Sequence, residues 1–306
     1  MNRAVVLAVI VAACVGWAQQ FSHRDPPPPE SRPILRVDTN LVLVPVTVTD
    51  SRGAVVPNLD RTKFVLTEER QHQEIISFSH ETAPVSLALV VDLSGSMANK
   101  IATARVAVEA ILDNLEDEDE ELLVTFADTA ELRLPFTDDT SAIRGALTSA
   151  EPRGSTALFD AVALAVHEMH RAQNRRRVLF LISDGGDNHS RLTKRELRGL
   201  LDEEDVQIHA IGIHDRMASR EESRGPWILE DLAKMTGGRH QMVDDIGQLP
   251  TLAGEMSRAL HDRYLLGYKP TPLGLSGSFR RIDVKLVQAK GAPKLYVYAR
   301  RGYHMP

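Results

Sequence analysis

The sequence has almost no cysteine, with Cys14 as the one cysteine in 306 residues. A chain with a single cysteine can form neither an internal disulfide framework nor a cysteine-based zinc site. If the chain is cleaved after Ala18, as predicted below, the mature protein also lacks a thiol nucleophile. Its stability must then come from the hydrophobic core, with a bound metal ion as a second possible source.

An excess of basic residues is also missing. Lys and Arg total 36 against 42 Asp and Glu, which gives a net charge of −6. Nucleic-acid binding needs a strongly basic face, so we expect no nucleic-acid partner. A mildly acidic chain is compatible with cation binding. Hydrophobic residues at 43% and charged residues at 25% are close to the globular average, which indicates a packed protein.

No hydrophobic run is long enough to span a membrane. The longest run, residues 4–15, has about 12 residues, whereas a bilayer core needs about 20. Gly16 and Ala18 follow it at the −3 and −1 positions of a cleavage site. This layout is typical of a secretory signal peptide, here residues 1–18. It predicts an exported protein, periplasmic or secreted, with no transmembrane span in the mature chain.

Two further features precede the first predicted strand. Residues 11–14, Val-Ala-Ala-Cys, resemble a bacterial lipobox, which offers a minor alternative. In that case Cys14 would be lipidated and would anchor the protein to a membrane. Residues 19–33 contain four consecutive prolines and are predicted to form a stiff linker in the polyproline II conformation.

The segments 34–81 and 265–306 have the alternating pattern of β-strands. In residues 41–49, valines at every second position face one side, which is the period of a strand. Pro45 within this run predicts an edge or bulged strand, because proline cannot donate a ladder hydrogen bond. Each segment has two or three strands, too few to be stable alone. We therefore predict that the two segments pair into one small β-sandwich.

Between them, residues 82–264 alternate short apolar runs with amphipathic segments. The alternation predicts an α/β domain with a doubly wound, mostly parallel sheet, inserted in the β-sandwich. The expected strands include residues 87–91, 122–126, 178–182 and 206–213. The expected helices are residues 101–115, 157–169, 192–201, 226–235 and 249–262.

The segment Asp92-Leu93-Ser94-Gly95-Ser96 lies between a predicted buried strand and a predicted helix. In an open α/β sheet, ligands bind beyond the carboxyl ends of the strands. Asp92, Ser94 and Ser96 alternate along an extended turn, so their side chains can converge on one point. A carboxylate with hydroxyls is a hard oxygen site, which suits Mg²⁺, Mn²⁺ or Ca²⁺ rather than zinc.

This segment resembles the D-x-S-x-S signature of the metal-ion-dependent adhesion site (MIDAS) in von Willebrand factor A domains. That family completes its site with a threonine before a helix and an aspartate after the fourth strand. Thr156 and Asp184 occupy the matching places in this sequence. The resemblance covers about residues 85–262 and implies a Rossmann-like fold. The flanking β segments and the Arg-Gly-Tyr of residues 301–303 also resemble a family of exported bacterial proteins, prominent in acidobacteria, that carries this domain.

The resemblance implies a role for each of the five residues. Ser94 and Ser96 would coordinate one divalent cation directly, and Thr156 would do so directly or through water. Asp92 and Asp184 would supply negative charge, often through bound water. Magnesium is the expected ion, with manganese and calcium as alternatives. The sixth coordination position would be open, and in adhesive members of the family it takes a carboxylate from the protein partner.

These features predict a non-enzymatic, adhesion-type protein that binds a protein partner through its metal ion. One alternative is a structural or assembly module in which the metal only stabilises the fold. Another is a metal-dependent hydrolase, although no G-x-S-x-G motif surrounds Ser94 or Ser96 and no motif places a catalytic histidine. Helix capping or turn formation is a competing explanation for Asp92, Asp184 and Thr156.

A polar loop, residues 214–225, is predicted to leave the same sheet edge as the metal site. It contains Arg216, Arg220 and Arg224, which could meet acidic residues of a partner. Loops held by a rigid scaffold often carry function, so we expect this loop to select the partner. The alternative is a disordered connector.

Two other clusters have simpler explanations. His167 and His170 fall between the apolar positions of a predicted helix, which places them on its solvated face. The acidic run of residues 116–121 is predicted to form a solvated turn between a helix and a strand.

Overall fold

A computed structural model describes residues 41–213, 225–270 and 277–305. The predicted signal peptide, the lipobox cysteine, the proline-rich linker and the arginine-bearing loop lie outside these residues, apart from Gly225 at the end of the loop. Within the described ranges, no helix is both long enough and apolar enough to cross a membrane.

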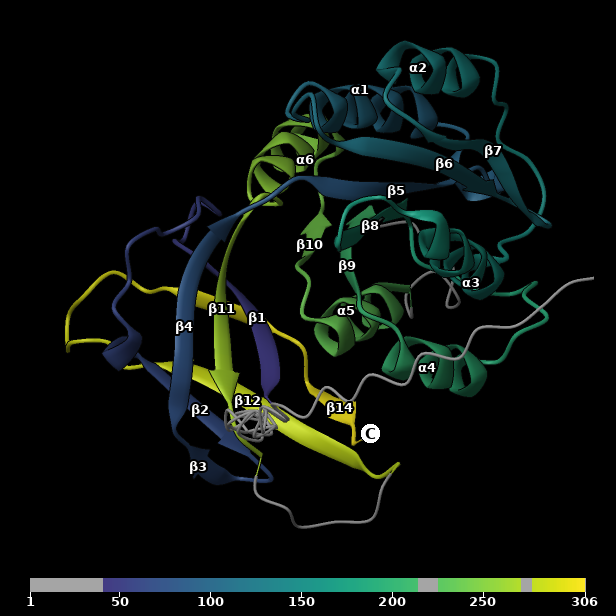
Figure 1. Cartoon of the computed structure of the whole chain (residues 1–306). Coiled ribbons are helices and arrows are strands. Elements are labelled where there is room, and N and C mark those ends of the chain that lie inside the picture. The colour runs from purple at the N-terminus through teal and green to yellow at the C-terminus, as the bar shows by residue number, and fades with distance from the viewer. Residues whose placement is uncertain (1–40, 214–224, 271–276, 306) are drawn as a thin grey trace, which may run out of the picture. The chain divides into compact units, whose positions relative to one another are not determined.

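A six-stranded sheet forms the centre of the α/β part (Figure 1). The strand order is β10-β9-β8-β5-β6-β7, and every neighbouring pair is parallel except β6 and β7. The predicted mostly parallel sheet is therefore confirmed. The strands are β5 (Val85–Asp92), β6 (Glu120–Phe126), β7 (Ala130–Thr137), β8 (Arg176–Ser183), β9 (Val206–Ile213) and β10 (His240–Val243).

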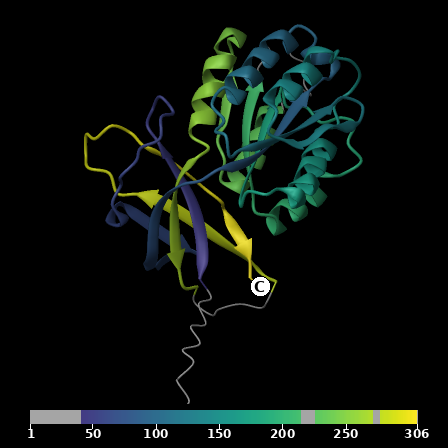
Figure 2. The same cartoon turned by 45° about the horizontal axis from the view of Figure 1, so that its top comes forward.

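Helices cover both faces of this sheet (Figure 2). Helices α1, α2 and α6 pack on one face, and α3, α4 and α5 on the other. Short 3-10 turns, including η2 (Gly95–Met97), link some of the elements. The helices are α1 (Ile101–Leu112), α2 (Thr140–Thr148), α3 (Leu158–Glu168), α4 (Lys194–Glu203), α5 (Gly225–Thr236) and α6 (Leu249–Arg258).

The central strand β5 shows why the sheet needs both layers of helices. All eight of its residues are buried. Leu87 and Leu89 belong to the core under α1 and α6, whereas Ala88 and Val90 belong to the core under α3. A strand buried on both faces reads as a continuous apolar run, which is the pattern seen in this sequence.

The remaining strands form two antiparallel sheets with a shared core. Segments from both ends of the described chain contribute to each sheet, so the predicted sandwich of N- and C-terminal segments is confirmed. One sheet has the order β13 (Tyr296–Ala299), β1 (Val42–Thr49), β11 (Asp262–Tyr268), β4 (Ile75–Thr82). The other has the order β14 (Gly302–His304), β12 (Phe279–Leu286), β2 (Phe64–Glu68), β3 (Gln71–Gln73).

The prediction that Pro45 marks an edge or bulged strand is wrong. Strand β1 lies inside its sheet, between β11 and β13. However, β13 pairs only with residues Val46 to Thr49, so Pro45 lies beyond the end of that partner. Because no residue of β13 lies opposite Pro45, no ladder hydrogen bond to β13 is lost at this position.

A buried carboxylate links four strands of the sandwich. The Glu68 side chain is fully buried. Its Oε1 accepts hydrogen bonds from the hydroxyls of Tyr268 (2.9 Å) and Tyr303 (2.8 Å), and its Oε2 accepts one from Arg280 (2.7 Å). These residues come from β2, β11, β14 and β12, so one side chain ties the N-terminal strands to the C-terminal ones.

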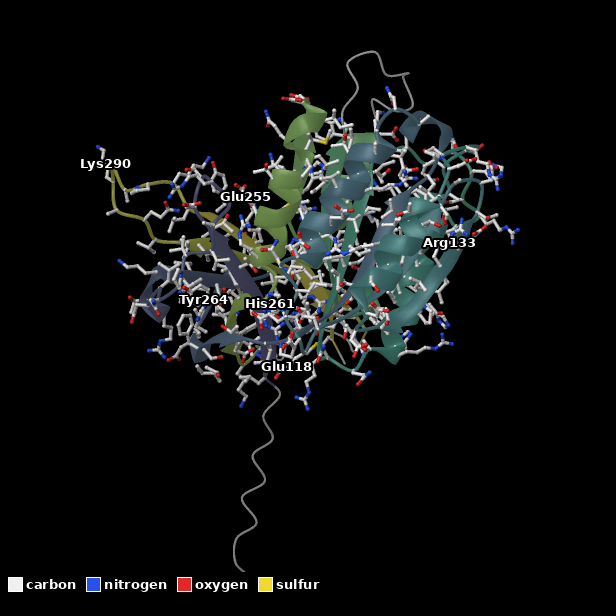
Figure 3. The ribbon with its side chains drawn as sticks, turned by 90° about the horizontal axis from the view of Figure 1, so that it is seen from above. Glu118, Arg133, Glu255, His261, Tyr264 and Lys290 are labelled. Atoms are coloured by element: carbon white, nitrogen blue, oxygen red, sulfur yellow. The ribbon has the colours of Figure 1, made fainter. Side chains whose placement is uncertain are left out.

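A second buried group lies where the chain enters and leaves the α/β part. Asp119 accepts hydrogen bonds from the backbone N–H of Val85 and from Nε2 of His261, both at 2.7 Å. Figure 3 labels His261 and Glu118, the residue before Asp119. The acidic run of residues 116–121 is therefore not simply a solvated turn: Asp119, Glu120 and Glu121 are buried, and the first two accept hydrogen bonds.

Candidate functional site

The candidate site begins at the carboxyl end of β5, the central strand. Asp92 ends this strand and is fully buried. Its Oδ1 accepts a hydrogen bond from the backbone N–H of Ser94 (2.8 Å), which holds the chain in a tight turn. The hydroxyl oxygens of Ser94 and Ser96 lie 3.1 Å apart. The structure thus brings together the three residues of the D-x-S-x-S segment.

A second loop lies against this turn. The backbone N–H of Gly95 donates to the carbonyl of Gly154 (3.0 Å), and the N–H of Arg153 donates to the carbonyl of Leu93 (2.8 Å). These two bonds hold the loop that carries Thr156 next to the turn that carries the serines. Thr156 itself is buried, with 6% of its surface exposed.

Gly154 has a backbone conformation that this loop requires. Its φ is +76°, in the left-handed region that favours glycine. A Cβ at this position would lie 2.4 Å from Oδ2 of Asp128. Asp128 in turn accepts a hydrogen bond from the N–H of Ser155 (2.7 Å), and this bond lowers the pKa of Asp128. Because Gly154 has no Cβ, the Asp128 carboxylate can approach the loop closely and accept the hydrogen bond from Ser155.

The third loop follows β8 and contains Asp184. Asn188 in this loop accepts a hydrogen bond from the N–H of Thr156 (2.8 Å), and its own N–H donates to the Thr156 carbonyl (3.0 Å). Loops after β5, after α2 and after β8 are therefore joined by backbone hydrogen bonds. All five predicted residues lie on these three loops or at the strand ends that precede them.

The two aspartates influence each other electrostatically. Burial and, to a lesser extent, the negative charge of Asp184 raise the pKa of Asp92 to about 7, although hydrogen bonds from Ser183 and Ser94 oppose the rise. Asp184 is also buried, with 5% of its surface exposed. Two buried carboxylates close to each other are costly unless positive charge compensates them.

Lys100 supplies positive charge at this site. Its Nζ lies 3.1 Å from Oδ2 of Asp184, and both side chains are buried, with 6% and 3% exposed. Lys100 lies at the start of α1, eight positions after Asp92 in the sequence. Sequence reasoning missed this residue, because a lysine before an amphipathic helix usually points to solvent.

Helix capping does not explain Thr156, whereas Asp92 does stabilise the turn that follows it. Helix α3 has Ala157 as its N-cap and no side-chain capping bond, so Thr156 does not cap it. The Asp92 carboxylate accepts from Ser94 within the turn and from the Ser183 hydroxyl (2.5 Å) on the neighbouring strand. Ser183 was also missed as a site residue, although its position directly before Asp184 was visible in the sequence.

The two helical histidines do not join this site. His170 is half-exposed, and its Nε2 lies 2.9 Å from a carboxylate oxygen of Glu204. His167 contacts the His170 ring edge-on. Within the described ranges, no group of three or more His, Cys, Asp or Glu side chains is arranged to hold a metal ion.

Comparison with known proteins identifies the domain. Residues 87–186 match the family described as von Willebrand factor type A domain, and this segment contains Asp92, Ser94, Ser96, Thr156 and Asp184. The chain carries a von Willebrand factor type A domain. No curated protein matches the sequence significantly.

Solved structures support the fold of this VWA domain. A von Willebrand factor type A protein from Catenulispora acidiphila is similar over 86% of this chain and 75% of its own, with 15% identity and a TM-score of 0.51. Proximal thread matrix protein 1 from the mussel byssus, solved with a zinc-occupied MIDAS motif, is similar over 63% of this chain and 49% of its own. Its identity is 20% and its TM-score is 0.51. At these identities the likeness concerns the fold alone.

The chemistry of the donor set in the VWA domain fits a hard divalent cation. The five predicted residues offer two carboxylates and three hydroxyls, and oxygen atoms of this kind are the ligands that Mg²⁺, Mn²⁺ and Ca²⁺ prefer. The buried charge of Asp92 and Asp184 is a second reason, because a cation beside them would offset their mutual repulsion. The residues present therefore fit a metal of this class.

A hollow of about 250 Å³ lies beside the same loops. Leu93 and Asp128 line it on the side of the candidate site. Arg133, labelled in Figure 3, and Arg153 bring positive charge to it, while Glu131 and Glu151 bring negative charge.

Proposed function

We propose that Asp92, Ser94, Ser96, Thr156 and Asp184 bind one divalent cation, and that this cation binds an acidic group of a protein partner. The observation that carries the proposal is the pair of hydroxyls of Ser94 and Ser96, 3.1 Å apart, on a turn held by the buried Asp92. Magnesium is the proposed ion, with manganese or calcium as alternatives.

The contacts of each residue suggest how the ion is held. Ser94 and Ser96 offer their hydroxyls as direct ligands, and Thr156 offers a third. Both Asp92 oxygens already accept hydrogen bonds, from Ser94 and from Ser183, so Asp92 acts mainly through its charge or through water. The bound ion would supply a concentrated positive charge that attracts a carboxylate from outside.

The mussel protein lends support to a divalent cation at this position. Its MIDAS motif holds zinc, and its fold is similar to that of the present VWA domain. Zinc therefore belongs among the ions to test, beside magnesium, manganese and calcium. Preference for magnesium rests on the oxygen-only donor set, because zinc in proteins is usually bound by nitrogen and sulfur.

The setting of the site is also a proposal. We infer an exported protein, periplasmic or secreted, with lipid anchoring through Cys14 as the minor alternative. In this arrangement the VWA domain occupies residues 82–264 and the sandwich segments occupy 34–81 and 265–306. The proposed activity is binding and not catalysis. A loop with Arg216, Arg220 and Arg224 would help to choose the partner.

An Asp92→Ala variant tests the metal site. A ligand that binds only the native state stabilises it by about 2.7 kcal/mol at a hundredfold excess over Kd. Mg²⁺ should therefore raise the Tm of the unaltered protein but not that of the variant, as measured by differential scanning calorimetry. The matched control is Asp117→Ala, because Asp117 is exposed and precedes the opposite end of strand β6. Equal Mg²⁺ shifts in all three proteins would refute the site.

Affinity capture from the native envelope fraction tests the partner. In Mg²⁺ the immobilised protein should retain a partner that EDTA releases, and Asp92→Ala should retain none. If Mg²⁺ stabilises the protein but capture is the same in Mg²⁺ and in EDTA, the ion serves the fold alone. That outcome would favour the structural-module alternative over adhesion.

A further inference from the structure

Both groups of the ion pair between Lys100 and Asp184 are withdrawn from solvent. Their side chains are 6% and 3% exposed, and Nζ and Oδ2 lie 3.1 Å apart. The start of α1 is fixed by a hydrogen bond from the Lys100 N–H to the Met97 carbonyl (2.8 Å). A buried ammonium needs a compensating negative charge, and the Asp184 carboxylate supplies it.

Asp184 is also one of the proposed metal residues. A divalent cation beside its carboxylate would lie close to the Lys100 ammonium. Like charges near a partly buried site repel strongly, because the effective dielectric constant is far below that of water. The ammonium and the cation therefore compete for the same carboxylate.

We propose that Lys100 is a built-in competitor of the divalent cation, which must displace the ammonium from Asp184 in order to bind. This inference rests on the proposed function. Lys100 neutralises Asp184 and so sets the cation concentration at which the site fills. The opposite role would make Lys100 a positioning residue that aims Asp184 at the ion, and the two roles predict opposite effects on cation affinity.

A Lys100→Met variant separates the two roles. Methionine matches the apolar stem of lysine in length, fills a buried position and carries no charge. Isothermal titration calorimetry on the full mature chain would measure the Kd for Mg²⁺ and for Mn²⁺. We expect binding to be about tenfold tighter in the variant, which corresponds to about 1.4 kcal/mol. The matched control is Lys194→Met, because Lys194 is 43% exposed and pairs with Asp231, which is not one of the proposed metal residues.

Each outcome decides between the ideas. Tighter binding in Lys100→Met alone supports the competitor. Equal or weaker binding in that variant, with Mg²⁺ binding intact in the unaltered protein, overturns the competitor and leaves the metal site standing. Absence of Mg²⁺ binding in every protein overturns both proposals.

A second measurement needs no substitution and covers the case in which Lys100→Met fails to fold. Acetic anhydride modifies free amines, and mass spectrometry of peptides reports the extent at each lysine. Saturating Mg²⁺ should increase the modification of Lys100 relative to Lys194, because a displaced ammonium is no longer held by Asp184. In the Asp92→Ala variant, Mg²⁺ should change the modification of neither Lys100 nor Lys194. If Mg²⁺ leaves the modification of Lys100 in the unaltered protein unchanged or lowers it, the competitor role of Lys100 is overturned.

Discussion

The hydroxyl of Ser183 donates a 2.5 Å hydrogen bond to Oδ2 of Asp92, across two neighbouring parallel strands. The same hydroxyl accepts a hydrogen bond from the N–H of Gly185 (2.8 Å). Ser183 thus connects the end of β5 to the loop that carries Asp184. The residue takes no part in the proposed coordination, yet it orients one charged group and the backbone next to the other.

Replacement of Ser183 by Ala should therefore destabilise the domain. The substitution leaves a buried carboxylate oxygen without its donor, which costs about 1–3 kcal/mol of unfolding free energy. Urea unfolding followed by circular dichroism would measure the loss. Ser149→Ala is the control, because Ser149 is exposed and should change stability by less than about 0.5 kcal/mol. A Ser183→Ala protein as stable as the control would show that this bond contributes nothing.

Two glycine substitutions should act in opposite directions. Gly154→Ala places a Cβ 2.4 Å from the Asp128 carboxylate at a φ of +76°, and should lower the unfolding free energy by about 1–3 kcal/mol. Gly145 lies inside helix α2 with no atom near its Cβ position, so Gly145→Ala should raise it by up to about 1 kcal/mol. Thermal unfolding of both variants measures the contrast. Similar shifts in the two would contradict the strained-loop explanation.

The buried His209 should make the protein sensitive to acid. Burial, together with the positive charges of Arg239 and Arg176, lowers the pKa of His209 to about 3. The unfolded chain binds a proton near pH 6.5, whereas the folded protein does not until about pH 3. Unfolding is therefore favoured progressively as pH falls between these values, by an amount of several kcal/mol.

A His209→Gln variant isolates this contribution. Glutamine offers an acceptor where His209 Nδ1 accepts from the Arg239 N–H (3.3 Å), but it does not titrate. The difference in unfolding free energy between variant and unaltered protein should shift in favour of the variant as pH falls from 7 to about 4. The comparison is needed because burial raises the pKa of Asp92 and Glu121 to about 7, which acts in the opposite direction. If this difference in unfolding free energy is constant with pH, His209 does not contribute to the acid sensitivity.

Glu68 should be critical for the sandwich. Glu68→Ala removes the acceptor of two tyrosine hydroxyls and leaves Arg280 without this carboxylate, so it should cost about 3–5 kcal/mol. Glu74→Ala is the control, because Glu74 is exposed and lies on the connection to β4. Urea unfolding measures both. If the two variants are equally stable, the link between N- and C-terminal strands does not depend on Glu68.

Much of the fold could be predicted because the pattern of apolar and polar residues that marks a strand or a helix is visible in the local sequence. The apolar runs of β5 and β9 were visible, and β9 was placed at the bounds the structure has. Strand β10, with four residues, was missed because it is too short to show a period. Edge strand β7 and the short helix α2 were also missed, since each buries only part of its surface.

The sequence alone determined the alternation of strands and helices, and it placed Asp92, Ser94 and Ser96 on one turn, because five adjacent residues need no distant partner to share a turn. Only the tertiary structure decided that Lys100 pairs with Asp184 and Ser183 with Asp92, contacts between residues 84 and 91 positions apart. Such pairs form because the carboxyl ends of parallel strands meet at one edge of the sheet, where packing excludes water. Burial at that edge requires each charge to find a partner, and no local pattern says which residue it will be.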